Sequence, residues 1–344
     1  MRAYVLREPS VGAVENVECP EPGAHQAVIK VDAVGLCGTD AELYAGTMAY
    51  YGLGMATYPL RPGHEWTGTV SSIGPGVDEA WLTQRVTGDP ILGCLSCRRC
   101  EEGRQHLCSD RYEVGVRKGW SGALAEELLV PVSSLYRVPD NLSVRTAAMV
   151  EPAANALRSV DAGQVSQGST VCIWGSGTLA LLALQFARVR GAQTIDVVGI
   201  SAPSLRLAQR LGADRVYVEK AEGSDFYDVV IDASNSPAAA GLALEAVTPG
   251  GRVVLIGLAD SPGPVDLRRA VLNDITVIGL LSGSPAFDAT ISMLSQGGVD
   301  TESLIAEIIS LDDVSRMLEM KQAHRTGAPK TLVDPRRGSR TTLP

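Results

Sequence analysis

The chain has 344 residues, of which 45% are apolar and 20% are charged, and its formal net charge is −9. This length favours two domains of roughly 150 residues each, and the apolar content excludes a disordered chain or a small disulfide-stabilised one. The acidic balance is unfavourable for binding nucleic acid or an anionic membrane surface, so neither is expected as a partner.

The first part of the chain is predicted to be rich in β-structure. Runs of β-branched or alternating residues predict strands over Gln26–Val34, Trp66–Ile73 and Ala125–Val130, with glycine and proline turns between them. The segment after Met1 lacks the apolar stretch of a secretory signal, which favours a cytoplasmic protein.

Two isolated metal-binding side chains stand at the ends of predicted strands. Cys37 lies within Gly35–Asp40 (GLCGTD), and His64 is followed by Glu65. Glu151, at the end of the β-rich region, could add an oxygen ligand. Three protein ligands with an exchangeable fourth position make a catalytic zinc site, in which zinc lowers the pKa of a bound alcohol. The alternative is ordinary packing, because a lone cysteine or histidine is often a buried core residue.

A compact loop of the same region carries four cysteines: Cys94, Cys97, Cys100 and Cys108. Four thiolates can hold tetrahedral zinc in a closed shell that leaves no position for water, so the spacing predicts a structural zinc site. Redox-active CxxC pairs are an alternative. A zinc ribbon that binds nucleic acid is another, and the acidic balance disfavours it.

The chain changes character over about Val150 to Leu281. Apolar strands are predicted at Thr170–Trp174, Thr194–Ile200, Val229–Ala233, Arg252–Gly257 and Thr276–Leu280. Helical patterns alternate with them at Leu179–Arg190, Ser204–Leu211 and Ala238–Ala246. This alternation is typical of a parallel sheet covered by helices. The uncharged stretch 162–187 is broken by glycines into pieces too short to span a membrane.

A glycine-rich turn joins the first of these strands to the helix that follows. The pattern is Gly-x-Gly-x-x-Ala, and its predicted dinucleotide contacts are Gly175, Ser176, Gly177, Thr178 and Leu179. The first glycine makes the tight turn, and the second lets the backbone approach a pyrophosphate at the helix N-terminus. Because this motif lies between a strand and an apolar helix, it predicts a dinucleotide site.

The end of the second strand bears on the choice of cofactor. It is Gly199, without the acidic residue that would bind the ribose 2′-hydroxyl of NAD, and Asp196 falls in mid-strand. Ser201 and Arg206 could bind a 2′-phosphate, so NADP is favoured over NAD. The alternative for Arg206 is an ordinary solvated helix residue.

The ends of the later strands are expected to line the nicotinamide. These positions are Gly257, Leu258 and Leu281, at the carboxyl edge where ligands bind to such sheets. Lys330 is a candidate phosphate contact. The edge strand Thr276–Leu280 is a candidate surface for a homodimer or homotetramer.

Two helical patterns and a strand follow, at Ala286–Gln296, Leu311–Lys321 and Lys330–Val333. This C-terminal segment is expected to return to the first domain. The predicted division is therefore one domain over 1–150 and 285–344, and a second over 151–284.

The motifs around Cys37 and His64, together with the four-cysteine loop, resemble those of zinc-dependent medium-chain dehydrogenases (the zinc alcohol dehydrogenase family), over about residues 1 to 335. Glu151-Pro152 resembles the sorbitol/polyol and threonine dehydrogenase branch. With Gly63–Trp66 it also resembles the 2-deoxy-scyllo-inosamine dehydrogenases of antibiotic pathways. The resemblance implies an α/β protein with a GroES-like β-rich catalytic domain and a Rossmann domain with a doubly wound parallel sheet.

The resemblance also implies roles for single residues. The catalytic zinc would be bound by Cys37, His64 and either Glu65 or Glu151. Thr39 would accept the proton of the substrate hydroxyl, and Asp40 would orient the ring of His64. Glu42 stands where a relay histidine is common, so the proton path would end on a carboxylate or on water. Arg158 replaces another common histidine and could contact a substrate or cofactor oxygen.

The function expected from these features is hydride transfer between a secondary alcohol, or its ketone, and NAD(P), with two zinc ions per subunit. The substrate class expected is a polyol, sugar or aminocyclitol of specialised metabolism. The segment Leu43–Leu60 could shape its pocket with four tyrosines, Tyr44, Tyr50, Tyr51 and Tyr58, or these could be packing residues. Alternatives are a threonine or amino-alcohol dehydrogenase, a zinc-dependent lyase or reductase on the same scaffold, and a non-catalytic dinucleotide sensor.

Overall fold

The computed structural model describes residues 1–218, 226–259, 261–321 and 327–338. They form two compact units. The first comprises Met1–Glu151 and the described parts of Ile305–Arg325 and Lys330–Pro344. The second comprises the described parts of Pro152–Leu304 and Thr326–Pro329.

The first unit is built on a sheet in the strand order β16-β17-β3-β4-β5-β9, with β8 paired to β3 as well. Its strands are β3 (Gln26–Gly35), β4 (Glu65–Ile73), β5 (Arg85–Gly88), β8 (Glu127–Pro131), β9 (Leu135–Arg137), β16 (Ile305–Ile309) and β17 (Lys330–Val333). All pairs are antiparallel except β16 with β17. Two short pairs add β1 (Arg2–Glu8) with β2 (Val11–Asn16), and β6 (Ile91–Leu92) with β7 (Tyr112–Glu113).

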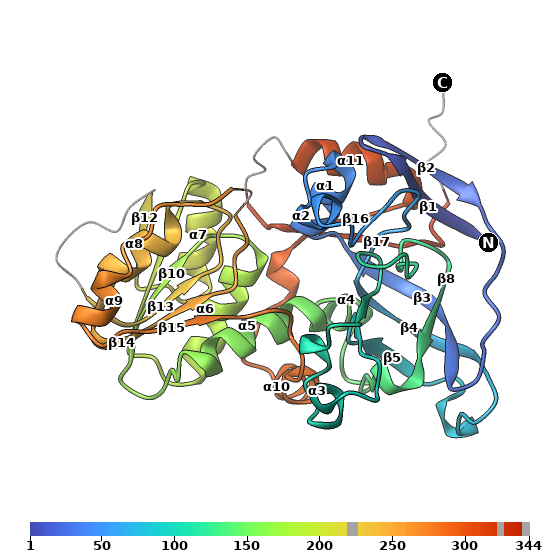
Figure 1. Cartoon of the computed structure of the whole chain (residues 1–344), viewed down its shortest axis with the longest axis horizontal. Helices are drawn as coiled ribbons and strands as arrows, with labels where there is room; N and C mark the ends of the chain where they lie inside the picture. Colours follow the sequence, from blue (N-terminus) through green and yellow to red (C-terminus); the bar gives the residue numbers. More distant parts are fainter. Residues whose placement is uncertain (219–225, 260, 322–326, 339–344) are drawn as a thin grey trace. The chain divides into compact units, whose positions relative to one another are not determined.

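The helices of this unit are short. They are α1 (Gly38–Ala45), α2 (Ala49–Gly52), α3 (Arg98–Glu101), α4 (Val144–Ala147) and α11 (Val314–Lys321). Figure 1 shows α1 beside α11, where the Tyr44 hydroxyl donates to Glu319 at 2.8 Å. Single 3₁₀ turns lie at Glu79–Trp81, Gln105–Leu107, Val132–Ser134, Glu302–Leu304 and Leu311–Asp313.

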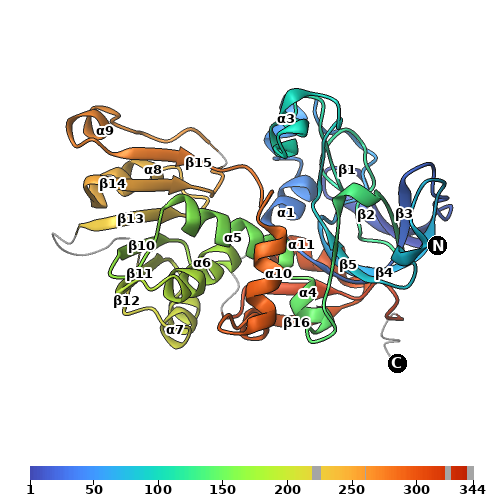
Figure 2. The same ribbon diagram turned by 90° about the horizontal axis from the view of Figure 1, so that it is seen from below.

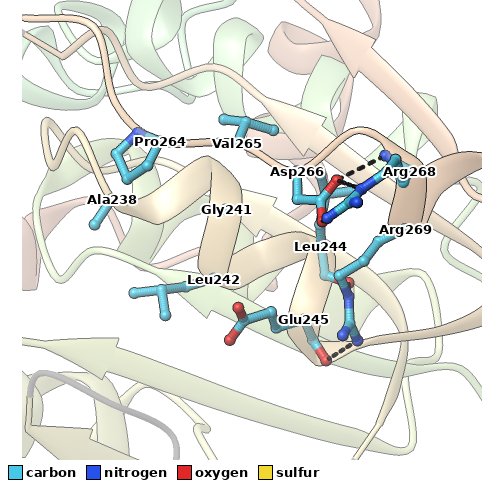
Figure 3. A pocket seen from close by; sticks show the side chains of 10 residues that line it. All are labelled: Ala238, Gly241, Leu242, Leu244, Glu245, Pro264, Val265, Asp266, Arg268 and Arg269. Carbon is cyan, nitrogen blue, oxygen red and sulfur yellow. Dashed lines mark hydrogen bonds and ion pairs between the residues drawn. The ribbon is translucent and has the colours of Figure 1, made fainter.

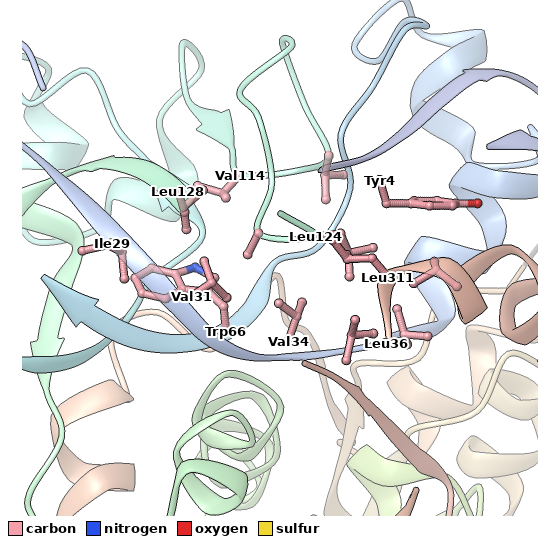
Figure 4. Close-up of a cluster of buried hydrophobic side chains, with 14 of the residues drawn as sticks. Tyr4, Ile29, Val31, Val34, Leu36, Trp66, Val114, Leu124, Leu128 and Leu311 are labelled. Atoms are coloured by element: carbon pink, nitrogen blue, oxygen red, sulfur yellow. The ribbon is translucent and has the colours of Figure 1, made fainter. Parts of the chain in front are cut away.

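The core of the first unit forms where β3 and β4 present apolar side chains to the C-terminal segment. Ile29 and Val31 of β3 are fully buried, whereas Lys30 between them is exposed, as alternation along a strand requires. Figure 4 shows Trp66, Leu124 and Leu311 in this cluster. The segment around Leu311 thus completes a core that the N-terminal strands begin.

The second unit is an open parallel sheet in the order β12-β11-β10-β13-β14-β15. Its strands are β10 (Thr170–Trp174), β11 (Thr194–Gly199), β12 (Arg215–Val218), β13 (Tyr227–Asp232), β14 (Val247–Leu255) and β15 (Thr276–Gly279). Figure 2 shows the strands in this order, from β15 to β12. Numbered along the chain, the order is 3-2-1-4-5-6, which is the Rossmann arrangement.

Helices connect these strands. They are α5 (Val150–Ala162), which precedes β10, and α6 (Thr178–Val189), α7 (Ala202–Arg210), α8 (Ala239–Ala246), α9 (Arg268–Leu272) and α10 (Phe287–Gln296). Because right-handed crossovers leave β10 and β13 in opposite directions, α6 and α8 cover opposite faces of the sheet. The predicted fold class, a GroES-like domain with a Rossmann domain, is confirmed.

One expected boundary differs from the structure. Residues 285–304 were expected in the first domain, but they belong to the second unit. The reason is local: α10 buries Phe287 and Leu294, and the backbone of Asp300 exchanges hydrogen bonds with the side chain of Gln185 in α6. In the part of the chain that the structure describes, no helix is long and apolar enough to cross a membrane.

Candidate active site

The pairing of β3 with β4 brings the two isolated metal-binding residues together. Gly35, the last residue of β3, lies opposite Glu65, the first residue of β4. Cys37 follows β3 by two positions and His64 immediately precedes β4, so the two side chains converge at one end of the strand pair. Donor atoms of Cys37, His64 and Glu65 all lie within 4.8 Å of one another.

Of the two predicted carboxylate ligands, Glu65 is the one that this cluster contains. Its side chain is 2% exposed, and a side chain at Gly35 would collide with it, because a Cβ there would lie 2.2 Å from Oε2 of Glu65. Glu151, in the first turn of α5, is buried but does not belong to the group. The choice between the two as a metal ligand stays a prediction.

Asp40 organises the surroundings of the cluster. Its Oδ2 accepts a hydrogen bond from the Cys37 N–H at 2.8 Å, and its Oδ1 accepts one from the Gly63 N–H at 3.2 Å. The same Oδ1 lies 3.6 Å from Nδ1 of His64. Because Nδ1 faces Asp40, Nε2 is the ring nitrogen left for a metal. This is the geometry expected of an orienting carboxylate.

The cluster favours positive charge. Burial lowers the pKa of His64, but the carboxylate of Asp40 and the sulfur of Cys37 raise it by more, and the resulting pKa lies well above 6.5. Surroundings that stabilise an imidazolium also stabilise a metal cation at the same place. Together with a soft sulfur, an imidazole nitrogen and a carboxylate oxygen, they fit a zinc ion with an exchangeable position.

The predicted role of Lys330 as a phosphate contact stays a prediction, and the structure places this lysine beside the metal cluster. Its side chain is 3% exposed and pairs with Oε2 of Glu65, and Nζ also donates to the Leu36 carbonyl at 3.1 Å. The cause is strand register: β17 lies beside β3, with Leu332 opposite Gly35, so Lys330 lies near the residues that follow β3. Burial lowers the pKa of Lys330, but Glu65 and Cys37 raise it by more, and it stays charged.

The other predicted residues of this region lie on α1 and α5. Thr39 is in the first turn of α1, two residues after Cys37, and Glu42 is one turn further on; both are half-buried. Their roles in proton transfer stay predictions. Arg158 donates to the carbonyls of Leu281 and Ser282, at 2.6 and 2.7 Å, so it holds a loop of the second unit.

The four tyrosines of Leu43–Leu60 have protein partners for their hydroxyls. Tyr51 and Tyr58 stack on each other and both donate to the Leu43 carbonyl. Tyr44 donates to Ser10 and Glu319, and burial with the Glu319 contact raises its pKa to about 12. Tyr50 donates to Glu113 at 3.2 Å. These contacts favour the packing interpretation over substrate binding.

The four-cysteine lobe (residues 94–108) has the geometry of a closed metal site. Its donor sulfurs lie within 4.8 Å of one another, and Sγ of Cys97 is 3.6 Å from that of Cys100 and 3.8 Å from that of Cys108. Tetrahedral zinc with bonds of about 2.3 Å requires sulfurs about 3.8 Å apart. All four are free thiols. The set fits structural zinc, as predicted from the spacing.

The glycine loop of the second unit has the shape of a phosphate-binding turn. Gly175 has φ +115°, and a Cβ there would lie 2.8 Å from the Ala233 carbonyl oxygen. Gly177, the N-cap of α6, has open space where a Cβ would stand. The N–H groups of Thr178 and Leu179 begin a helix of 12 residues, and such a terminus attracts anions.

The tip of β11 closes against this loop. A Cβ at Gly199 would lie 2.6 Å from Oγ of Ser176, so only glycine allows the approach. Ser201 is the N-cap of α7, and its buried Oγ has no partner among the described residues. Arg206 lies on the exposed face of α7. Asp196 is fully buried and is bound by Arg215 and Tyr227, so it is unavailable to a ribose.

The later predicted contacts lie at the ends of β14 and β15. A Cβ at Gly257 would lie 1.8 Å from the Ser234 carbonyl oxygen, so the chain needs glycine there. Leu258 and Leu281 are 61% and 38% exposed, so both side chains are accessible to a ligand.

Each of the two units matches a domain of known protein families. Residues 23–140 match the alcohol dehydrogenase GroES-like domain, and residues 178–296 match the zinc-binding dehydrogenase domain. The chain is 30% identical to L-threonine 3-dehydrogenase of Anaeromyxobacter sp. (strain K), over 97% of this chain and 99% of that protein. The chain belongs to the zinc-dependent medium-chain dehydrogenase family.

Two further relatives of this medium-chain dehydrogenase bear on its chemistry. Sorbitol dehydrogenase of Bacillus subtilis (strain 168) is 27% identical, over 98% of each chain. A protein assigned as a zinc-binding dehydrogenase, from Sinorhizobium meliloti 1021, was solved bound to NADP; it is 29% identical, with a TM-score of 0.87 over 97% of this chain and 99% of that one. The protein is thus a zinc oxidoreductase of the alcohol dehydrogenase type that uses a nicotinamide cofactor.

Proposed function

We propose that this dehydrogenase oxidises a secondary alcohol of a polyhydroxylated substrate, namely a polyol, sugar or aminocyclitol, in specialised metabolism. The observation that carries the proposal is the convergence of Cys37, His64 and Glu65 within 4.8 Å. A zinc ion bound there supplies a Lewis acid that lowers the pKa of the substrate alcohol. In this proposal the first unit holds the alcohol and the second binds the dinucleotide.

The residues around the cluster would prepare and remove the proton. Thr39 accepts the hydroxyl proton of the substrate, and Glu42, three positions along α1, receives it. Residues three apart lie on one face of a helix, which supports this path. Asp40 keeps the imidazole of His64 oriented through the 3.6 Å approach of Oδ1 to Nδ1. A bound nicotinamide ring would supply the acceptor for the hydride of the carbon that bears this hydroxyl.

A substrate panel tests the proposal. The zinc-loaded enzyme is assayed with sorbitol, a secondary aminocyclitol alcohol, L-threonine and 2-propanol, with NAD and with NADP. The highest kcat/KM is expected for the polyol or the aminocyclitol. The second candidate, a threonine or amino-alcohol dehydrogenase, is supported by the 30% identity to L-threonine 3-dehydrogenase, and a preference for L-threonine would establish it. Dinucleotide binding without turnover of any alcohol would show a sensor.

Replacing Cys37 tests the site itself. Cys37→Ala removes one of three ligands, and we expect activity to fall by about 10³-fold or more. The zinc content should fall from two ions per chain to one, because the four-cysteine lobe is untouched. Cys19→Ala, at an exposed thiol outside both sites, is the matched control. An active Cys37→Ala enzyme would overturn the assignment.

The preferred cofactor is proposed to be NADP. The support is the glycine at the end of β11, the Ser201 hydroxyl, which has no partner in the described part of the chain, and the exposed Arg206. The NADP-bound relative supports it as well. Arg206→Ala should lower kcat/KM with NADP by about ten-fold and leave the NAD value unchanged, since guanidinium–phosphate bonds are of the stronger kind. Arg210→Ala, also exposed on α7, is the control. A wild-type preference for NAD would refute the proposal.

The protein is further proposed to form a homodimer or homotetramer through the β15 edge of its sheet. Val271 and Leu272 of α9 are 81% and 82% exposed. Figure 3 shows an adjoining pocket of about 660 Å³ between α8, residues 264–266 and α9. Its arginines are bound internally: Arg268 pairs with Asp266, and Arg269 donates to the Leu244 carbonyl. An open strand edge beside exposed apolar side chains favours association with a second copy.

A further inference from the structure

Three arginines hold the part of the four-cysteine lobe that carries its last ligand. Arg99 donates to the carbonyl of Leu107, Arg111 to that of Cys108 at 3.3 Å, and Arg117 to that of Ser109 at 3.4 Å. The three acceptors are consecutive. Four thiolates around a divalent zinc ion leave a net negative charge, which nearby guanidinium groups stabilise.

Two of these arginines also meet a buried carboxylate. Oε1 of Glu113 accepts from Nε of Arg111 at 2.8 Å and lies 3.9 Å from Nη1 of Arg117. Glu113 and Arg117 are 7% and 6% exposed. Among the residues that the structure describes, Nε and Nη1 of Arg117 are buried without a hydrogen-bond partner. Two guanidinium groups face this one carboxylate. The four thiolates of a zinc-loaded lobe would supply the balance.

The same carboxylate oxygen reaches the segment that joins the two metal-ligand motifs. The hydroxyl of Tyr50, in α2, donates to Oε1 of Glu113 at 3.2 Å. A second link lies nearby, where the Lys118 N–H donates to the Met55 carbonyl at 2.9 Å. The joining segment, residues 46–60, begins where α1 ends and leads through three residues to His64. It is thus fastened to the lobe side of the unit at two points.

Glu113 connects the four-cysteine lobe to Tyr50, so a shift of the lobe would also shift Tyr50. It belongs to β7, where it pairs with Ile91 of β6, and β6 ends two residues before Cys94. The strand pair therefore forms the base of the lobe, and a displacement of the lobe displaces Glu113. The polar links from Cys108 through Arg111 and Glu113 to Tyr50 are continuous.

We propose that the four-cysteine lobe positions the joining segment 46–60 through Glu113 and Tyr50, and that Glu113 is thereby a positioning residue for substrate binding. In this proposal the lobe stabilises its own loop and also holds segment 46–60 in position. The effect on substrate rests on the proposed function, because the segment connects Cys37 and Thr39 with His64. The effect on the segment itself does not.

The test is a cycle of Tyr50→Phe, Glu113→Gln and the double variant. Hydrogen–deuterium exchange within 46–58 is expected to rise by about ten-fold in each single variant, since a hydrogen bond to a charged group is lost. The double variant should add little, because both changes break one link. Exchange in β10 to β14 should stay unchanged. Tyr112→Phe is the matched control, as Tyr112 is next to Glu113 but faces Trp120 and Lys118.

Steady-state kinetics with the best alcohol of the panel give the second readout. KM for the alcohol should rise in both single variants while kcat and the KM for the dinucleotide hold, and two zinc ions per chain should remain. Unchanged exchange in 46–58, or fully additive effects, would overturn the proposal even if the enzyme is active. If no alcohol is oxidised, the proposed function fails, and exchange alone still decides whether the network holds the segment.

Discussion

At the scale of single residues, the metal cluster contains a charge balance that the metal-ligand motifs do not show. Glu65 and Lys330 are both almost fully buried and face each other, with Cys37 and Glu151 near enough to affect the lysine. A buried carboxylate without a cation is costly, whereas a buried pair approaches balance. Lys330 therefore stabilises the fold by neutralising the buried carboxylate of Glu65.

Replacement of this lysine tests the balance. Lys330→Met should lower the free energy of unfolding by about 3–5 kcal/mol, because Glu65 would be left buried and unpaired. Lys330→Met combined with Glu65→Gln should recover most of the loss. Urea unfolding followed by tryptophan fluorescence measures this, since Trp66, Trp81 and Trp120 lie in the first unit.

The exposed pair Arg98–Glu102 provides the control for that experiment. Arg98 is 90% exposed in its side chain, so Arg98→Met should cost less than about 1 kcal/mol. Equal stability of the Arg98→Met and Lys330→Met proteins would contradict the importance of the buried pair.

Site residues could be predicted from sequence where the residues of a motif lie close together along the chain, and not where the fold brings distant residues together. Cys94 to Cys108 and the GLCGTD motif around Cys37 have local spacing that specifies their chemistry, and the structure brings each set together. Lys330 acts on Glu65 from 265 positions away, and only the register of β17 beside β3 places it there. Glu113 has no distinctive neighbours in sequence either, because its partners arrive through the fold.

At the scale of elements, two strands of the second unit show what made a strand predictable. The strand β10 was predicted with its correct ends, since its apolar residues form an unbroken run with four buried positions. The strand β12 was missed: it has four residues, begins with Arg215 and is only partly buried at the sheet edge. The helix α9 was missed because its exposed Val271 and Leu272 break the amphipathic pattern.

One polar contact joins three elements of the second unit and makes its stability depend on pH. Oδ2 of Asp214, just before β12, accepts from the Ile195 N–H of β11 and from Arg188 of α6, both at 2.7 Å. Partial burial raises the pKa of Asp214, but these two donors lower it by more, so it lies below its usual value.

A carboxylate with a lowered pKa stabilises the fold above its unfolded pKa of about 3.9, and the contribution disappears as the pH falls through the folded-state value. Asp214→Asn should therefore be less stable to urea at pH 7, by less than about 1 kcal/mol because the pair is partly screened by solvent. The two proteins should become equally stable as the pH falls through the folded-state pKa of Asp214. Arg188→Gln, which removes the opposite charge, should show the same convergence. A difference that does not vary with pH would disprove this account.

At the scale of the whole molecule, the chain length was sufficient to predict two units but not where each begins and ends. The return of the chain to the first sheet was expected, and β16 and β17 perform it. The point of return lies at Ile305 rather than at 285, because α10 has its apolar contacts within the second unit.

The proposed association through the second unit gives a prediction at this scale. Val271→Glu together with Leu272→Glu should reduce the mass measured by light scattering from that of two or four chains to that of one, because charges would face each other across the interface. Val189→Glu, at another exposed apolar position of the same unit, should leave the mass unchanged. A wild-type protein that is monomeric at every concentration would refute the proposed interface.

The position of β17 beside β3 has a consequence for how the protein is made. Ribosomes release Cys37 and His64 early, but the strand that supplies the cation for Glu65 leaves last, after the whole second unit. Until then β3 lacks its neighbour β17, and the carboxylate of Glu65 in β4 lacks the counter-charge of Lys330. Since domains fold as units during synthesis, the dinucleotide-binding unit can fold before the metal centre is complete. A truncated chain would thus bind cofactor without a finished catalytic centre.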